Sequence, residues 1–212
     1  MVYSPDNKLT RITVFYDGGF LANINDYYKD YHPKKSLLSI EGIHEFATQK
    51  VAEEEKVDAK FCRVIESHYF RGRFSANEAN ENHLRKDREF DETLMKAGVI
   101  THYLVRDKKK GEAGIDVWFA LEALEAAVYK RFNVLVLIAG DADYIPLVRK
   151  LNSLGTRVML LGWNIKFPGG TDRGAITNER LIKEVNYFVE VDKLIDSRED
   201  AKAGYSKILF GQ

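Results

Sequence analysis

The sequence has few of the features that mark several protein classes. Its single cysteine, Cys62, excludes an intramolecular disulfide and suits a reducing compartment. No run approaches the roughly 20 apolar residues that a membrane helix needs. The opening residues contain no basic region that leads into an apolar stretch. We therefore expect a cytoplasmic protein that has no membrane partner.

The chain also has no excess of charge. Its 32 lysines and arginines balance 32 aspartates and glutamates, so any attraction to nucleic acid must come from local patches. The 45% hydrophobic content is enough for a sizeable core, and we predict one domain over residues 1-192. Residues 193-212 are polar and then apolar. We expect them to form a loosely attached tail, or a segment that docks a protein partner or a second copy of the chain.

Short β-rich runs alternate with stretches of helical spacing, such as Val117, Leu121, Leu124 and Val128. The predicted strands are residues 11-16, 59-70, 99-105, 133-139, 157-163 and 187-191. Because parallel strands need crossover helices and covered faces, this alternation predicts a three-layer, Rossmann-like α/β sandwich with a mainly parallel central sheet.

Acidic residues follow two of these strands. Asp17 ends the first strand, and Asp141 and Asp143 follow the fourth. In the commonest doubly wound order the first and fourth strands are neighbours, and ligands bind beyond their carboxyl ends. Asp116 begins the helix that precedes the fourth strand. We expect these four carboxylates to converge on one crevice.

Carboxylates held close together must take up protons or bind a cation. Oxygen ligands without histidine or cysteine favour Mg²⁺ or Mn²⁺ over Zn²⁺. A structural role is the alternative for each residue. Asp141 or Asp143 could cap the helix that follows, Asp116 could be a first-turn acid, and Asp17 could hold the glycine turn after it.

The segments VFYDGGFL, GIDVWFALEALE and LIAGDADYIPLVRKLNSLGTRVMLLGW occur in this order between Arg11 and about Val191. In sequence and spacing they resemble the NYN domain family, a PIN-like nuclease group that includes the LabA-type proteins. The resemblance implies a PIN-like fold whose acidic cluster binds divalent metal and cleaves RNA to leave a 5′-phosphate. The implied cluster is Asp17, Asp116, Asp141 and Asp143.

Two positions depart from the family pattern. Phe20 stands where the family often has an asparagine, and Glu122 stands where many members have an aspartate. The alternative to a metal-dependent ribonuclease is therefore an RNA-binding or scaffold protein with weak or no catalysis. A sugar-nucleotide transferase with an Asp-x-Asp motif would need a longer chain. A haloacid-type phosphatase would need an aspartate at Gly19.

Basic residues near the strand ends are candidates for RNA binding. They are Arg71, Arg73, Lys108, Lys109 and Lys110. These cations would bind phosphates without reading sequence. Tyr69, Phe70 and Phe74 interleave with the arginines and could stack unpaired bases. For the charged helix predicted over residues 77-97, exposure to solvent is a simpler explanation of the charges than contact with RNA.

Overall fold

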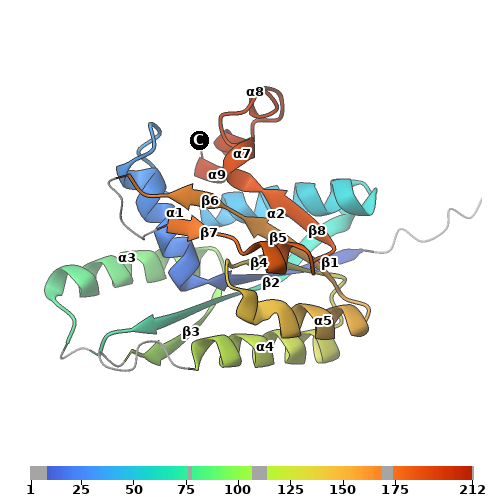
Figure 1. Ribbon diagram of the computed structural model, residues 1–212, viewed down its shortest axis with the longest axis horizontal. Helices are drawn as coiled ribbons and strands as arrows, with labels where there is room; N and C mark the ends of the chain where they lie inside the picture. The colour runs from blue at the N-terminus through green and yellow to red at the C-terminus, as the bar shows by residue number, and fades with distance from the viewer. Residues whose placement is uncertain (1–8, 76–77, 107–113, 169–173, 212) are drawn as a thin grey trace, which may run out of the picture.

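A six-stranded parallel sheet forms the centre of the molecule (Figure 1). The computed structural model describes residues 9-75, 78-106, 114-168 and 174-211. The strand order is β3-β2-β1-β4-β5-β8, and each neighbouring pair is parallel. The strands are β1 (Thr10–Asp17), β2 (Cys62–Arg73), β3 (Ile100–Val105), β4 (Val134–Ile138), β5 (Arg157–Gly162) and β8 (Tyr187–Glu190). The predicted Rossmann-like sandwich is confirmed.

The two strands that carry the acidic residues lie side by side. Residues 12-16 of β1 pair in register with residues 134-138 of β4. On its other edge β1 pairs with β2. The chain first builds β2 and β3 on that side of β1 and then crosses to build β4, β5 and β8 on the other side. Because the strands are parallel, Asp17 and the turn after β4 lie at the same edge. This edge is the switch point at which such sheets bind ligands.

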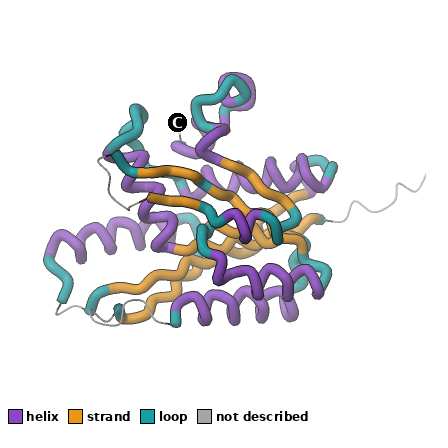
Figure 2. The backbone as a smooth tube through the Cα atoms, in the orientation of Figure 1, coloured by secondary structure: helices purple, strands orange, loops and turns teal. Residues whose placement is uncertain are grey.

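Helices cover both faces of the sheet, and Figure 2 shows the strands enclosed between them. One face packs against α1 (Gly18–Asp30), α2 (Ile40–Glu55) and α3 (Glu81–Lys96). The other packs against α4 (Ile115–Lys130) and α5 (Ile145–Ser153). Side chains of β1 alternate between the two cores, with Tyr16 in the first and Phe15 in the second. None of the helices in the described ranges is long and apolar enough to cross a membrane.

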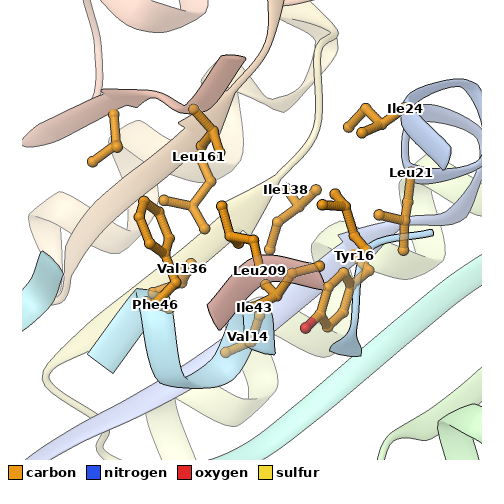
Figure 3. Close-up of a cluster of buried hydrophobic side chains, with 14 of the residues drawn as sticks. Val14, Tyr16, Leu21, Ile24, Ile43, Phe46, Val136, Ile138, Leu161 and Leu209 are labelled. Atoms are coloured by element: carbon orange, nitrogen blue, oxygen red, sulfur yellow. The ribbon is translucent and has the colours of Figure 1, made fainter. Parts of the chain in front are cut away.

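The C-terminal segment differs from the expected loose tail over its described residues, 193-211. After the short helices α7 (Val191–Leu194) and α8 (Asp200–Ala203), α9 (Tyr205–Phe210) packs against α2. Leu209 is fully buried, and it lies beside Ile43 and Phe46 in Figure 3. The backbone N–H of Ser39 donates to the carbonyl oxygen of Leu209 at 2.8 Å. The apolar end of the chain therefore completes the core, and a partner contact through this segment stays a prediction.

The apolar stripe that predicts α4 points away from the sheet. Val117, Leu121 and Val128 are 64%, 60% and 48% exposed. The buried side of the helix instead carries Phe119 and several small residues, including Ala123. Because alanines leave room for close approach, this side lets α4 lie near the strands while Phe119 fills the remaining space. The helix is confirmed, but Val117, Leu121 and Val128 face solvent.

The stretch between β5 and β8 contains a small antiparallel pair. β6 (Asn164–Lys166) pairs with β7 (Gly174–Ile176), and α6 (Glu179–Ile182) follows. The pair lies against the turn after β4, where a Cβ on Gly140 would fall 2.7 Å from the carbonyl oxygen of Ile176. The N–H of Asn178 donates to the carbonyl oxygen of Gly140 at 2.9 Å. These contacts hold the turn that carries Asp141.

Candidate active site

Asp17 lies at the junction between β1 and α1. It is the N-cap of α1, and its Oδ1 accepts hydrogen bonds from the N–H groups of Gly19 at 2.9 Å and Phe20 at 3.1 Å. Gly18 has no room for a side chain, because a Cβ there would lie 2.6 Å from both Tyr69 Cζ and the carbonyl oxygen of Phe70. The Asp-Gly-Gly sequence thus fixes the carboxylate and lets Tyr69 pack on the backbone beside it.

The hydroxyl of Tyr144 connects Asp17 with Asp116, which are 99 positions apart in the sequence. It lies 3.0 Å from Asp116 Oδ1 and 3.4 Å from Asp17 Oδ2. A tyrosine hydroxyl has one proton, so it donates to one carboxylate at a time, and the shorter distance favours Asp116. Burial, followed by the charges of the two carboxylates, raises the pKa of Tyr144 far above its ordinary value. The hydroxyl therefore stays protonated and acts as a donor between two acidic groups.

Asp141 and Asp143 lie on the turn that follows β4. Asp141 is the N-cap of the 3-10 helix η2 (Ala142–Tyr144), and its Oδ1 accepts from the N–H of Asp143 at 3.0 Å. Both side chains are exposed. The expected capping role is thus present at Asp141. It uses one carboxylate oxygen, so it is compatible with a further ligand.

All four acidic residues lie at the N-terminal ends of helices. Asp17 caps α1, Asp116 lies in the first turn of α4, and Asp141 and Asp143 begin η2, which leads directly into α5. The unpaired N–H groups and the dipole of a helix N-terminus stabilise negative charge. Together the four residues gather acidic side chains at this edge of the sheet.

The oxygen donors at this edge suit a hard divalent cation. Within the described ranges, no group of three or more His, Cys, Asp or Glu side chains is arranged to hold a metal ion. Mg²⁺ commonly uses only one or two protein carboxylates and completes its shell with water and substrate phosphates. Asp17 and Asp116, which contact the same hydroxyl, would supply two carboxylates to such an ion. The residues present fit Mg²⁺ or Mn²⁺ by donor chemistry.

The two positions that depart from the family pattern have structural roles. Phe20 is buried, and its ring lies 2.6 Å from the point that a Cβ on Gly140 would occupy and 6.3 Å, centroid to centroid, from the ring of Trp163. Glu122 accepts a hydrogen bond from the indole N–H of Trp118 at 2.9 Å. Phe20 thus packs the base of the acidic edge, and Glu122 is engaged on α4.

The predicted basic residues differ in what they contact. Arg71 is half-buried, and its guanidinium donates to Tyr69 Oη at 3.3 Å, next to the Asp17 turn. Arg73 instead forms two hydrogen bonds with Asp91, of 2.9 and 2.5 Å, and lies 3.4 Å from the ring centroid of Tyr103. Arg73 is therefore occupied by contacts within the protein. Lys108, Lys109 and Lys110 lie outside the described residues.

The family model described as NYN domain matches residues 11–192. The chain belongs to the NYN domain family. NYN domains are PIN-like nucleases, and this supports a ribonuclease function in general terms. Comparison with curated proteins gives no significant match. Membership of the LabA-type subgroup stays a prediction.

Sequence reasoning missed Tyr144, whose hydroxyl joins two of the acidic residues in this NYN domain. A signal was available, because Tyr144 ends the same GDADY segment that carries Asp141 and Asp143. Buried tyrosines usually have a polar partner for their hydroxyl. A tyrosine placed directly after two acidic residues at a strand end was therefore a candidate for the site.

Proposed function

We propose that this NYN domain is a divalent-metal-dependent ribonuclease that hydrolyses phosphodiester bonds of single-stranded or structured RNA. The observation that carries the proposal is the contact of the Tyr144 hydroxyl with both Asp17 and Asp116. It supports the convergence of acidic residues from distant parts of the chain at the switch point of the sheet. Membership of a nuclease family supports the same reaction class. We place this activity in the cytoplasm.

The four carboxylates have distinct places in the proposed reaction. Asp17 and Asp116 are the first ligands for Mg²⁺ or Mn²⁺, with Asp141 as a further ligand. When bound, the cation neutralises charge on the phosphate and makes water a stronger acid. Asp143 is exposed beside Asp141 and accepts the proton of the attacking water. The water oxygen bonds to phosphorus, the bond to the leaving ribose oxygen breaks, and that oxygen takes up a proton from solvent water, to which the exposed Asp143 later returns its own.

Positive charge near the carboxylates holds the substrate in this proposal. Arg71, beside the Asp17 turn through its contact with Tyr69, binds an RNA phosphate. We keep Lys108, Lys109 and Lys110 as predicted phosphate contacts on the segment that leads to Asp116. Arg73 contributes only if its pairing with Asp91 opens.

A cleavage assay with labelled single-stranded RNA tests the proposal. Wild-type protein is incubated with Mn²⁺, Mg²⁺ or EDTA, alongside Asp141→Asn. Asp30→Asn is the matched control, because it removes a carboxylate at the far end of α1. We expect cleavage by the wild type and the control with either metal, and none with EDTA or with Asp141→Asn. Metal-dependent cleavage that persists in Asp141→Asn would show that the site is wrong.

The second candidate is an RNA-binding protein of the same family without catalysis. The observation in its favour is Phe20, a buried ring where the family often has an asparagine next to the acidic cluster. In the same assay this candidate gives tight RNA binding and no cleavage in Mn²⁺ or Mg²⁺. Recovery of cleavage in Phe20→Asn would then assign the loss of activity to that substitution.

A further inference from the structure

A cavity of about 450 Å³ lies between α1, α3 and the end of β2. Its volume falls within the range of about 300–1,000 Å³ that is common for sites that bind small molecules. Tyr69 connects the cavity to the acidic edge, since its ring lines the cavity and its hydroxyl end packs against Gly18, next to Asp17. Tyr69 is 1% exposed, so a single buried side chain separates the cavity from the acidic edge.

Cations line the cavity on several sides. Lys29 comes from α1, Arg71 from β2, Lys86 from α3 and Arg106 from the end of β3. Lys29 and Lys86 are exposed, and neither forms an ion pair with the rest of the described chain. Among the described residues, three acidic side chains also line the cavity, Asp26 from α1 and Asp87 and Glu89 from α3. Lys29 and Lys86 therefore leave positive charge available to a phosphate.

An aromatic platform forms one rim of the cavity. Phe74 is 36% exposed, and its ring stacks on the imidazole of His83, with centroids 6.2 Å apart and planes at 19°. The guanidinium of Arg106 lies 5.3 Å from the Phe74 ring centroid. Exposed rings beside cations are the arrangement with which proteins stack unpaired bases while holding the backbone.

We propose that this cavity holds one unstacked nucleotide of a single-stranded RNA, with its base against Phe74 and its phosphate near Arg71 and Lys86. The inference rests on the proposed function, because the same strand would continue past Tyr69 to the acidic edge. A base in a duplex is stacked and paired, so it cannot enter the cavity. The cavity therefore makes the protein select single strands.

Binding of fluorescent single-stranded RNA, measured by anisotropy in EDTA with Asp141→Asn as the parent protein, tests the cavity without cleavage. Phe74→Leu removes the stacking ring, and Phe74→Tyr keeps it. We expect Phe74→Leu to bind roughly 5- to 150-fold more weakly, the loss typical of one stacked base, and Phe74→Tyr to bind as the parent does. The parent should also prefer the single strand to its duplex, and Phe74→Leu should lose most of that preference.

Lys86 and Arg88 give a matched test of the phosphate contact. Both are exposed cations on α3, but only Lys86 lines the cavity. Lys86→Ala should reduce the slope of log affinity against log salt by about 0.7, the value for one phosphate contact to a single strand, and Arg88→Ala should leave it unchanged. Equal losses in the two variants, or parental affinity in Phe74→Leu, would overturn the inference.

The outcomes separate this inference from the proposed nuclease function. If Phe74→Leu and Lys86→Ala lose affinity but the wild type does not cleave RNA in Mn²⁺ or Mg²⁺, the nucleotide site is supported and the nuclease function is contradicted. If the wild type cleaves RNA in a metal-dependent way and both cavity variants bind RNA as the parent does, the nuclease function is supported and the nucleotide site is contradicted.

Discussion

Replacement of Tyr144 by phenylalanine removes the hydroxyl between Asp17 and Asp116 and leaves the ring in place. The ring is 2% exposed and packs 4.7 Å, centroid to centroid, from Phe119, so phenylalanine preserves the packing. The two carboxylates then lose their common donor. Their mutual repulsion is no longer offset, and the folded state loses stability.

The expected magnitude follows from the contacts that are lost. A hydrogen bond to a charged group contributes about 1.5–3 kcal/mol to stability. The phenylalanine side chain of the variant recovers part of this loss, because it has no hydroxyl that must be desolvated when the chain folds. We expect Tyr144→Phe to lose about 1–3 kcal/mol in EDTA. For a chain of this size, that loss lowers the Tm by about 2–12 °C. A bound cation offsets the same repulsion, so the deficit should shrink in saturating Mn²⁺.

Thermal unfolding of wild type and Tyr144→Phe, each in EDTA and in Mn²⁺, measures this effect. Tyr103→Phe is the control, because its hydroxyl also donates to a carboxylate, that of Asp91, away from the acidic edge. Its deficit should be the same with and without Mn²⁺. The reasoning is refuted if Tyr144→Phe unfolds as the wild type does in EDTA, or if its deficit does not change in Mn²⁺.

Three further predictions concern stability. Gly18→Ala places a Cβ against the Phe70 backbone and the Tyr69 ring, so it should lower the free energy of unfolding, measured by chemical denaturation, by about 1–3 kcal/mol. Gly19→Ala should lower it less, because the nearest atom to its Cβ is 3.3 Å away. Equal losses in the two variants would contradict this packing. Burial lowers the pKa of His44 to about 4 from 6.5, so the unfolded chain binds more protons between these values. The free energy of unfolding of the wild type should fall by about 3 kcal/mol as the pH drops from 6.5 to 4, and that of His44→Gln should fall less over this range. Parallel pH profiles of the two proteins would refute this. Leu209→Ala should lower the free energy of unfolding by about 2–5 kcal/mol, and Lys207→Ala, at an exposed position, should change it little; a loose tail would make both variants neutral.

The sheet and the edge that carries the acidic residues could be predicted because both depend on local pattern. Apolar β-rich runs separated by helical stretches predict a parallel sheet. In such a sheet the carboxyl ends of neighbouring strands meet at one edge. Asp17 and Asp141 follow strands directly, so their approximate placement needs no knowledge of side-chain packing.

The contacts that depend on how helices rotate could not be predicted in this way. The bridge from Tyr144 to Asp116 requires the position of α4, and periodicity alone does not choose which face of α4 meets the sheet. Arg73 meets Asp91 because α3 packs beside β2, an arrangement that the spacing of charges along the chain does not show. The docking of α9 on α2 likewise depends on a surface that only the folded chain presents.

The central claim is that Asp17 and Asp116 share one divalent cation. Titration of Mn²⁺ by electron paramagnetic resonance, with wild type, Asp17→Asn, Asp116→Asn and the double variant, tests it most directly. We predict that each single change weakens Mn²⁺ binding by at least about tenfold and that the double change adds little, because both residues act on the same ion. Wild-type affinity for Mn²⁺ in either single variant, or no binding of Mn²⁺ by the wild type, would contradict the account.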